Sequence, residues 1–161
     1  MKKEIEPRKE YPPKFLDWEV LKEEWNVYRL YDGTIFKTKL VLTHVLKTAS
    51  GERSSYDVGT TRIVTVLCPQ HLIGEPSKEI VPKEELNKYV VERNIRFDTI
   101  KSDWNEYLVR DEEERREFII RILETLVSIS RTSKRDNLGR PIYVFNSSGQ
   151  VVVHPKSQRG L

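Results

Sequence analysis

Two runs of alternating apolar and polar residues, separated by Asp32-Gly33, give the strongest local signal in the chain. They cover residues 25–31 and 34–46. Asp-Gly supplies the positive φ angles of a type I′ turn, whose twist matches that of two paired strands. The spacing therefore predicts a β-hairpin. In its second arm one face carries the large apolar side chains, namely Phe36, Leu40, Leu42 and Leu46.

Residues 111–133 show the three- and four-residue spacing of an amphipathic helix. Asp111 and Glu114 match a helix-capping pattern, and Glu117 precedes Arg121 by four positions, the favourable order for a helical ion pair. A long helix is predicted here. A shorter helix is predicted for residues 82–93, because proline suits the first helical position. The apolar stripe of the long helix comprises Phe118, Ile119, Ile122, Leu123, Leu126, Val127 and Ile129.

The remaining segments predict further strands. Residues 58–68 are apolar on both faces, which favours a central strand. Residues 142–146 and 150–154 predict a second hairpin that turns at 147–149, and residues 48–55 predict a polar loop. Residues 94–110 are compatible with either a strand or a helix.

A short internal echo is also present, since Trp25-Asn-Val-Tyr28 resembles Trp104-Asn-Glu-Tyr107. Four residues do not establish a repeat, which needs a period sustained over several copies. We interpret the echo as coincidence.

Together these signals predict an α+β fold: an antiparallel, strongly twisted or barrel-like sheet of five to six strands, built from two hairpins and packed against one long and one short helix. The expected organisation is a flexible basic tail over residues 1–14, a single α+β domain over 15–155 and a loose C-terminus over 156–161. The core is expected to contain Phe36, Leu40, Leu42, Val64, Val66, Phe118, Ile122, Leu126, Val144 and Val152.

Composition narrows the class of protein only slightly. The 161 residues include 28 basic and 25 acidic side chains, and charged residues make up 33% of the chain beside one cysteine and one methionine. This balance is typical of heat-adapted proteins. A single cysteine forms no internal disulfide, and no apolar run is long enough for a membrane span or a signal peptide. A cytoplasmic location without membrane association is expected.

Catalytic and metal-binding patterns are weak. Cys68 and His71 are spaced like half of a zinc site, but no second closely spaced pair accompanies them. No phosphate-binding glycine loop, zinc-protease motif or nucleophile elbow occurs. No catalytic residue, metal ligand or cofactor is therefore assigned, and an enzyme is the least favoured function.

Basic and aromatic residues on the predicted hairpin favour a non-catalytic binding module, with nucleic acid as its ligand. A sheet face that carries lysine, arginine and tyrosine can stack bases and pair with phosphates. A homo-oligomeric assembly or protein-interaction domain is the alternative. The candidate nucleic-acid-binding residues are Arg29, Tyr31, Lys37 and Lys39 on the hairpin, with Arg131, Lys134 and Arg135 as a second basic cluster.

Overall fold

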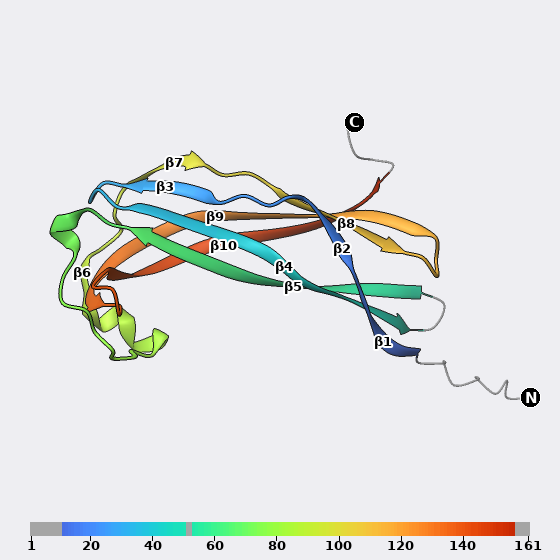
Figure 1. Cartoon of the computed structure of the whole chain (residues 1–161), viewed down its shortest axis with the longest axis horizontal. Coiled ribbons are helices and arrows are strands. Elements are labelled where there is room, and N and C mark those ends of the chain that lie inside the picture. Colours follow the sequence, from blue (N-terminus) through green and yellow to red (C-terminus); the bar gives the residue numbers. More distant parts are fainter. Residues whose placement is uncertain (1–10, 51–52, 157–161) are drawn as a thin grey trace, which may run out of the picture.

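The computed structural model describes residues 11–50 and 53–156, and it consists of two antiparallel sheets packed face to face (Figure 1). The expectations for residues 1–10, 51–52 and 157–161 lie outside the described residues, whereas positions 11–14 of the predicted tail belong to the first strand. The strands are β1 (Tyr11–Leu16), β2 (Trp18–Lys22), β3 (Asn26–Leu30), β4 (Ile35–Ser50), β5 (Arg53–Leu67), β6 (Val90–Glu92), β7 (Phe97–Lys101), β8 (Asn105–Asp111), β9 (Arg116–Arg135) and β10 (Pro141–Pro155).

Each sheet is built around one long hairpin. In sheet A, β5 pairs with one edge of β4, while β3 and β1 pair with successive parts of the other edge and β7 pairs with β3. In sheet B, β10 pairs with one edge of β9, while β8 and β6 share the other edge and β2 pairs with β8. The prediction of a single sheet is therefore wrong.

The predicted α+β class is also wrong, because the segment expected to form the long helix is the turn before β9 and most of that strand. Its apolar residues are nearly continuous, so they satisfy the spacing of a helix and of a strand at once. Pairing along both edges of β9 decides in favour of the strand, and the isoleucines suit a pleated surface. The side chains of Phe118, Ile120, Ile122 and Leu126 alternate toward the core.

The predicted short helix is reduced to a 3₁₀ helix. Pro82 lies just before this helix rather than at its first position, and the segment Lys83–Tyr89 has 3₁₀ geometry and then continues into β6. A second 3₁₀ helix covers Gln70–Leu72. The open assignment of residues 94–110 resolves as two strands, β7 and β8.

Three further strand predictions need correction. β10 runs without a turn through residues 147–149, where the ladder only shifts its register. The expected polar loop at 48–55 is largely strand, since β4 extends to Ser50 and β5 begins at Arg53. β5 pairs only with β4 among the described residues, so it lies at an edge and Val64 is 40% exposed. Of the predicted core, Val66, Val144 and Val152 are only partly buried.

The first predicted hairpin is confirmed, because β3 pairs with β4 around Asp32 and Gly33. Its turn differs from the expected type. Only Gly33 has a positive φ, 95°, and its N–H bonds to the Leu30 carbonyl at 3.0 Å. This is a three-residue loop that ends in a left-handed glycine, rather than a type I′ turn.

The two halves of the chain, β1–β5 and β6–β10, have the same strand order and nearly the same register. The pair Trp18–Val109 in sheet B corresponds to Phe97–Leu30 in sheet A, with 79 positions between Trp18 and Phe97 and between Leu30 and Val109 alike. The register irregularity within this pairing recurs at the same place in both sheets. The halves are therefore related by a pseudo-twofold axis, and each contributes one strand to the other's sheet.

The internal echo falls on equivalent positions of these halves, so the interpretation as coincidence is wrong. Asn26 and Asn105 begin β3 and β8, and both are buried. The Asn26 side chain donates to the Glu124 carbonyl and the Asn105 side chain to the Leu40 carbonyl, each at 3.3 Å.

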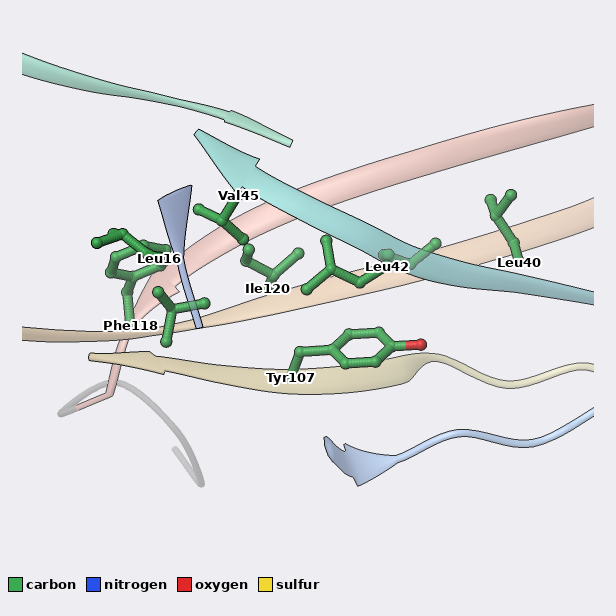
Figure 2. Packing of buried hydrophobic residues seen from close by; sticks show 9 residues of the cluster. Leu16, Leu40, Leu42, Val45, Tyr107, Phe118 and Ile120 are labelled. Carbon is green, nitrogen blue, oxygen red and sulfur yellow. The ribbon is translucent and has the colours of Figure 1, made fainter. Parts of the chain in front are cut away.

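The core is divided into two clusters that the same pseudo-symmetry relates. The first core joins the ends of β4 and β1 to β8 and β9 (Figure 2) and comprises Leu16, Leu40, Leu42, Val45, Tyr107, Val109, Phe118, Ile120 and Ile122. The second core comprises Tyr28, Leu30, Phe36, Ile95, Leu126, Ile129 and Tyr143. Buried polar side chains, including Asn26, Thr38 and Glu124, occupy the middle of the sandwich.

Candidate nucleic-acid interface

The four hairpin residues of the predicted site lie on one surface, the solvent-facing side of sheet A. In β3 and β4 the alternate positions Tyr28, Phe36 and Thr38 are buried in the sandwich, which turns Arg29 and Lys37 outward. Tyr31 follows β3 and is 65% exposed. We call this surface the outer face of sheet A.

The positive charges on this face differ in their surroundings. Arg29 and Lys37 form no ion pair with any residue that the structure describes. Lys39, in contrast, lies 3.4 Å from a Glu23 carboxylate oxygen and 5.5 Å from the centre of the Trp25 ring. The charge of Lys39 is therefore already neutralised, and Arg29 and Lys37 remain available.

Arg96 is a further basic residue of this face that the sequence interpretation missed. The Tyr31 N–H donates to the Arg96 carbonyl at 2.8 Å, which extends the β3–β7 ladder by one pair and places Arg96 beside Tyr31. The alternation of Ile95 and Phe97 was the available signal, because it turns Arg96 to the opposite side. Asp98 stands opposite Arg29 in the same ladder and is the acidic neighbour of the group.

The second predicted cluster does not join this surface. The Arg131 guanidinium is 3.0 Å from Asp32 and 2.7 Å from Glu92. Lys134 is 3.4 Å from Glu79 and 4.3 Å from the centre of the Tyr89 ring. Arg131 and Lys134 are therefore both paired with acidic side chains, unlike Arg29 and Lys37.

Arg135 is also held within the fold. Its Nη1 atom is buried and has no hydrogen-bond partner among the described residues. Its Nε atom lies so close to Gly74 that a Cβ there would be 2.9 Å away. Arg135 therefore packs against the loop that follows η1 rather than facing solvent.

Asp32 fixes the turn that carries Tyr31. Its carboxylate accepts hydrogen bonds from the Thr34 N–H at 2.9 Å, the Tyr143 hydroxyl at 2.7 Å and Arg131 at 3.0 Å. Burial alone would raise the pKa of Asp32, but these donors outweigh it and hold the pKa below its usual range. The turn is thus tied to β9 and β10 of the other sheet, which fixes the position of Tyr31.

The pseudo-symmetric surface on sheet B has different chemistry. Leu108 stands at the position equivalent to Arg29, and Arg121 at the position equivalent to Lys37. Arg121 pairs with Glu106 at 3.2 Å and lies over the Trp104 ring. The unpaired basic group is therefore a property of sheet A alone.

Other candidate chemistry is not assembled. Within residues 11–50 and 53–156, no three histidine, cysteine or acidic side chains form a group that could hold a metal ion. Cys68 follows β5 and is only partly buried, rather than lying within a central strand as expected. The carboxylates at 112–114, expected in the first turn of a helix, lie in and around the β8–β9 turn, where Glu113 and Glu114 pair with Lys47.

The comparisons with known proteins give no relative. No protein-family model, curated protein or solved structure matches this chain. No helix in the described part of the chain is long and apolar enough to cross a membrane. The chemistry of the surface is therefore the only basis for a functional proposal.

Proposed function

We propose that the protein is a non-catalytic module that binds single-stranded nucleic acid on the outer face of sheet A. The observation that carries the proposal is the contrast in pairing among the basic residues. Arg29, Lys37 and Arg96 share this face with the exposed ring of Tyr31 and form no ion pair with any described residue. Lys39, Arg131 and Lys134 each have an acidic partner.

The arrangement suits a single strand better than a duplex. An exposed tyrosine ring can stack on an unpaired base, and every base offers such a surface. The three cations on the same face can each neutralise one phosphate. Because single strands release about 0.7 counterions per phosphate contact, the log–log salt dependence should have a slope of about −2.

The test is fluorescence anisotropy of labelled single-stranded RNA and DNA, with a duplex for comparison, over a salt series. The double variant Arg29→Glu/Lys37→Glu should weaken binding to the single strand and flatten the salt slope. A matched control is Lys83→Glu/Lys88→Glu, which makes the same change in net charge at exposed residues of η2. Equal binding by the two double variants would contradict the assignment of this face.

Tyr31→Ala separates stacking from charge. The loss of one stacked base costs about 1–3 kcal/mol, so affinity should fall roughly tenfold while the salt slope stays unchanged. The absence of single-strand binding by the unmodified protein at low salt would reject the proposed function outright.

A further inference from the structure

The two longest unpaired edges of the sandwich belong to β5 and β10, which lie on the same side. Among the described residues, β5 pairs only with β4 and β10 only with β9. Each of these edge strands has 15 residues. Arg62 of β5 reaches across to β10, where its Nη2 atom is 2.9 Å from the Ser147 hydroxyl.

These edges lack the charges that normally protect an exposed strand. Charged residues make up 33% of the chain, yet β10 contains no aspartate, glutamate, lysine or arginine from Pro141 to Pro155. From Tyr56 to Leu67, β5 carries only Asp57 and Arg62, and Arg62 is turned inward to Glu124. Edge strands of monomeric proteins usually carry lysines, prolines or inward charges, because their free N–H and C=O groups pair readily with other chains. Between Tyr56 and Leu67, Arg62 is the inward-facing charge and Asp57 an exposed one, and β10 has prolines only at its two ends.

Apolar side chains of both strands are exposed along the combined edge of β5 and β10, which we call the β5/β10 seam. Val64, Val151 and Val153 stand opposite the buried residues Thr38, Ile122 and Ile120 in their ladders, so they belong to the inner faces of the sheets. They are nevertheless 40%, 46% and 46% exposed, since no further strand covers them. Val64 and Val151 occupy equivalent positions of the two halves, so both edges are open in the same way.

We propose that the combined β5/β10 edge is a dimer interface that takes the same edge of a second copy of this chain. Fifteen residues at about 3.4 Å each make an edge about 50 Å long, and two sheets stand about 10 Å apart. The strip is therefore about 500 Å² before side chains are counted, compared with the roughly 800 Å² that each partner contributes to a standard interface. This assembly goes beyond the proposed nucleic-acid function and does not depend on it.

The geometry of the two edges indicates which partner can bind them. A single extended peptide could pair with β5 or with β10 but not with both. A second copy presents two edges at the same spacing, and a twofold axis lets both ladders form at once. Because β10 is uncharged, its pairing brings no like charges together. Both sheets would then continue across the interface.

The experiment is sedimentation equilibrium of the full chain from about 1 to 100 µM, without nucleic acid. The unmodified protein should sediment at twice its mass of 19.0 kDa. Val153→Lys should raise the dimer dissociation constant at least about tenfold, because it places like charges within the interface. The matched control is Val127→Lys, an exposed valine in the central strand β9, which should leave the dimer intact.

Each outcome decides the proposal. A monomer of the unmodified protein at 100 µM overturns it, as does equal dissociation by the two lysine variants. Val151→Lys provides a second edge variant if Val153→Lys fails to fold by circular dichroism. The Arg29→Glu/Lys37→Glu protein should remain dimeric, because its substitutions lie on the outer face, so this result is separable from the nucleic-acid test.

Discussion

The pseudo-symmetric halves agree closely at the two ends of the sandwich. At one end the turn residue Asp32 accepts hydrogen bonds from Tyr143 and Arg131. At the other end Asp111, at the start of the β8–β9 turn, accepts a hydrogen bond from Tyr56 at 2.7 Å and pairs with Lys47 at 2.8 Å. In both cases a carboxylate from one half is held by a tyrosine and a cation from the other half.

The halves differ in the middle of the sandwich. Leu40 and Glu124 occupy equivalent positions, as do Arg62 and Gly149. The Arg62 Nε atom lies 2.5 Å from a carboxylate oxygen of Glu124, which is 1% exposed. In the symmetric place, Gly149 leaves room for the Leu40 side chain, which would be 3.7 Å from an added Cβ. An ion pair on one side of the axis thus corresponds to an apolar contact on the other.

The difference shows how backbone position determines which buried carboxylates can be satisfied. A carboxylate at a turn can accept from nearby free N–H groups, as Asp32 does from Thr34 and Asp111 from Glu114. Glu124 lies within a strand paired on both edges, where the N–H groups serve the ladders. Only side chains reach it, and its Oε1 atom has no hydrogen-bond partner in the part of the chain that the structure describes. The stability of the buried carboxylate in the middle of the sandwich therefore depends on Arg62 far more than that of either end carboxylate depends on one cation.

The largest expected effect comes from Arg62→Ala. Removing the cation leaves the Glu124 carboxylate buried without a charged partner, which should lower the free energy of unfolding by about 4 kcal/mol. Urea denaturation followed by circular dichroism measures the change. The double variant Arg62→Leu/Glu124→Leu, which makes the middle apolar in both halves, should recover most of the loss. A loss below about 1 kcal/mol for Arg62→Ala would show that the halves do not differ in this way.

The second prediction compares the two ends of the sandwich, where the effects should be smaller. Lys47→Met should lower the free energy of unfolding more than Arg131→Met does. Lys47 is surrounded by Asp111, Glu113 and Glu114, so its loss leaves three carboxylates together, one of them buried. We expect a loss of about 3 kcal/mol for Lys47→Met. Arg131→Met leaves Asp32 with two other donors and should cost about 1 kcal/mol. Equal losses in the same denaturation assay would contradict this ranking.

The smallest effect concerns stability in acid. At both ends of the sandwich, protonation of the buried aspartate should lower the free energy of unfolding. Burial opposes the charge of Asp111, but Lys47 and Tyr56 outweigh it, so the pKa values of Asp111 and Asp32 both lie below the usual 3.8. Each carboxylate therefore contributes stability above pH 3.8 that is lost as the pH falls through its folded-state pKa. Asp32→Asn and Asp111→Asn should each flatten the loss of stability on acidification. If the free energy of unfolding of a variant depends on pH as steeply as that of the unmodified protein, the aspartate at that end does not contribute to acid sensitivity.

Sequence patterns predicted part of the fold well. Asp32-Gly33 located the β3–β4 hairpin, because a tight turn between two alternating runs leaves few other arrangements. The same alternation placed Arg29, Tyr31 and Lys37 on one surface. The sequence did not show that Arg131 and Lys134 are paired, because their partners, Asp32, Glu92 and Glu79, are distant in the sequence. No local pattern reveals which charges will meet across a sandwich.

The helix prediction failed because local preference and final structure disagree in β9. Its capping pattern and charged pairs are genuine helical signals, yet the same residues close a β-turn and pair across strands: Arg116 stands opposite Asp111, and Glu117 bonds to Arg110. The echo of Trp25 and Trp104 was the stronger clue. It marks equivalent strands, and applying one register to both halves would have indicated that residues 116–135 repeat the strand at 35–50.

The exchange of strands between the halves has a consequence for how the molecule holds together. Sheet A needs β7 from the second half, and sheet B needs β2 from the first. Two separate half-chains would have to find each other by diffusion, and dilution would take them apart. The segment of residues 68–89 joins them, so the effective concentration of one half near the other is set by a short tether, of the order of millimolar, at any protein concentration. Cleavage of this tether would convert a folding equilibrium into an association equilibrium, and stability would then depend on the amount of protein present.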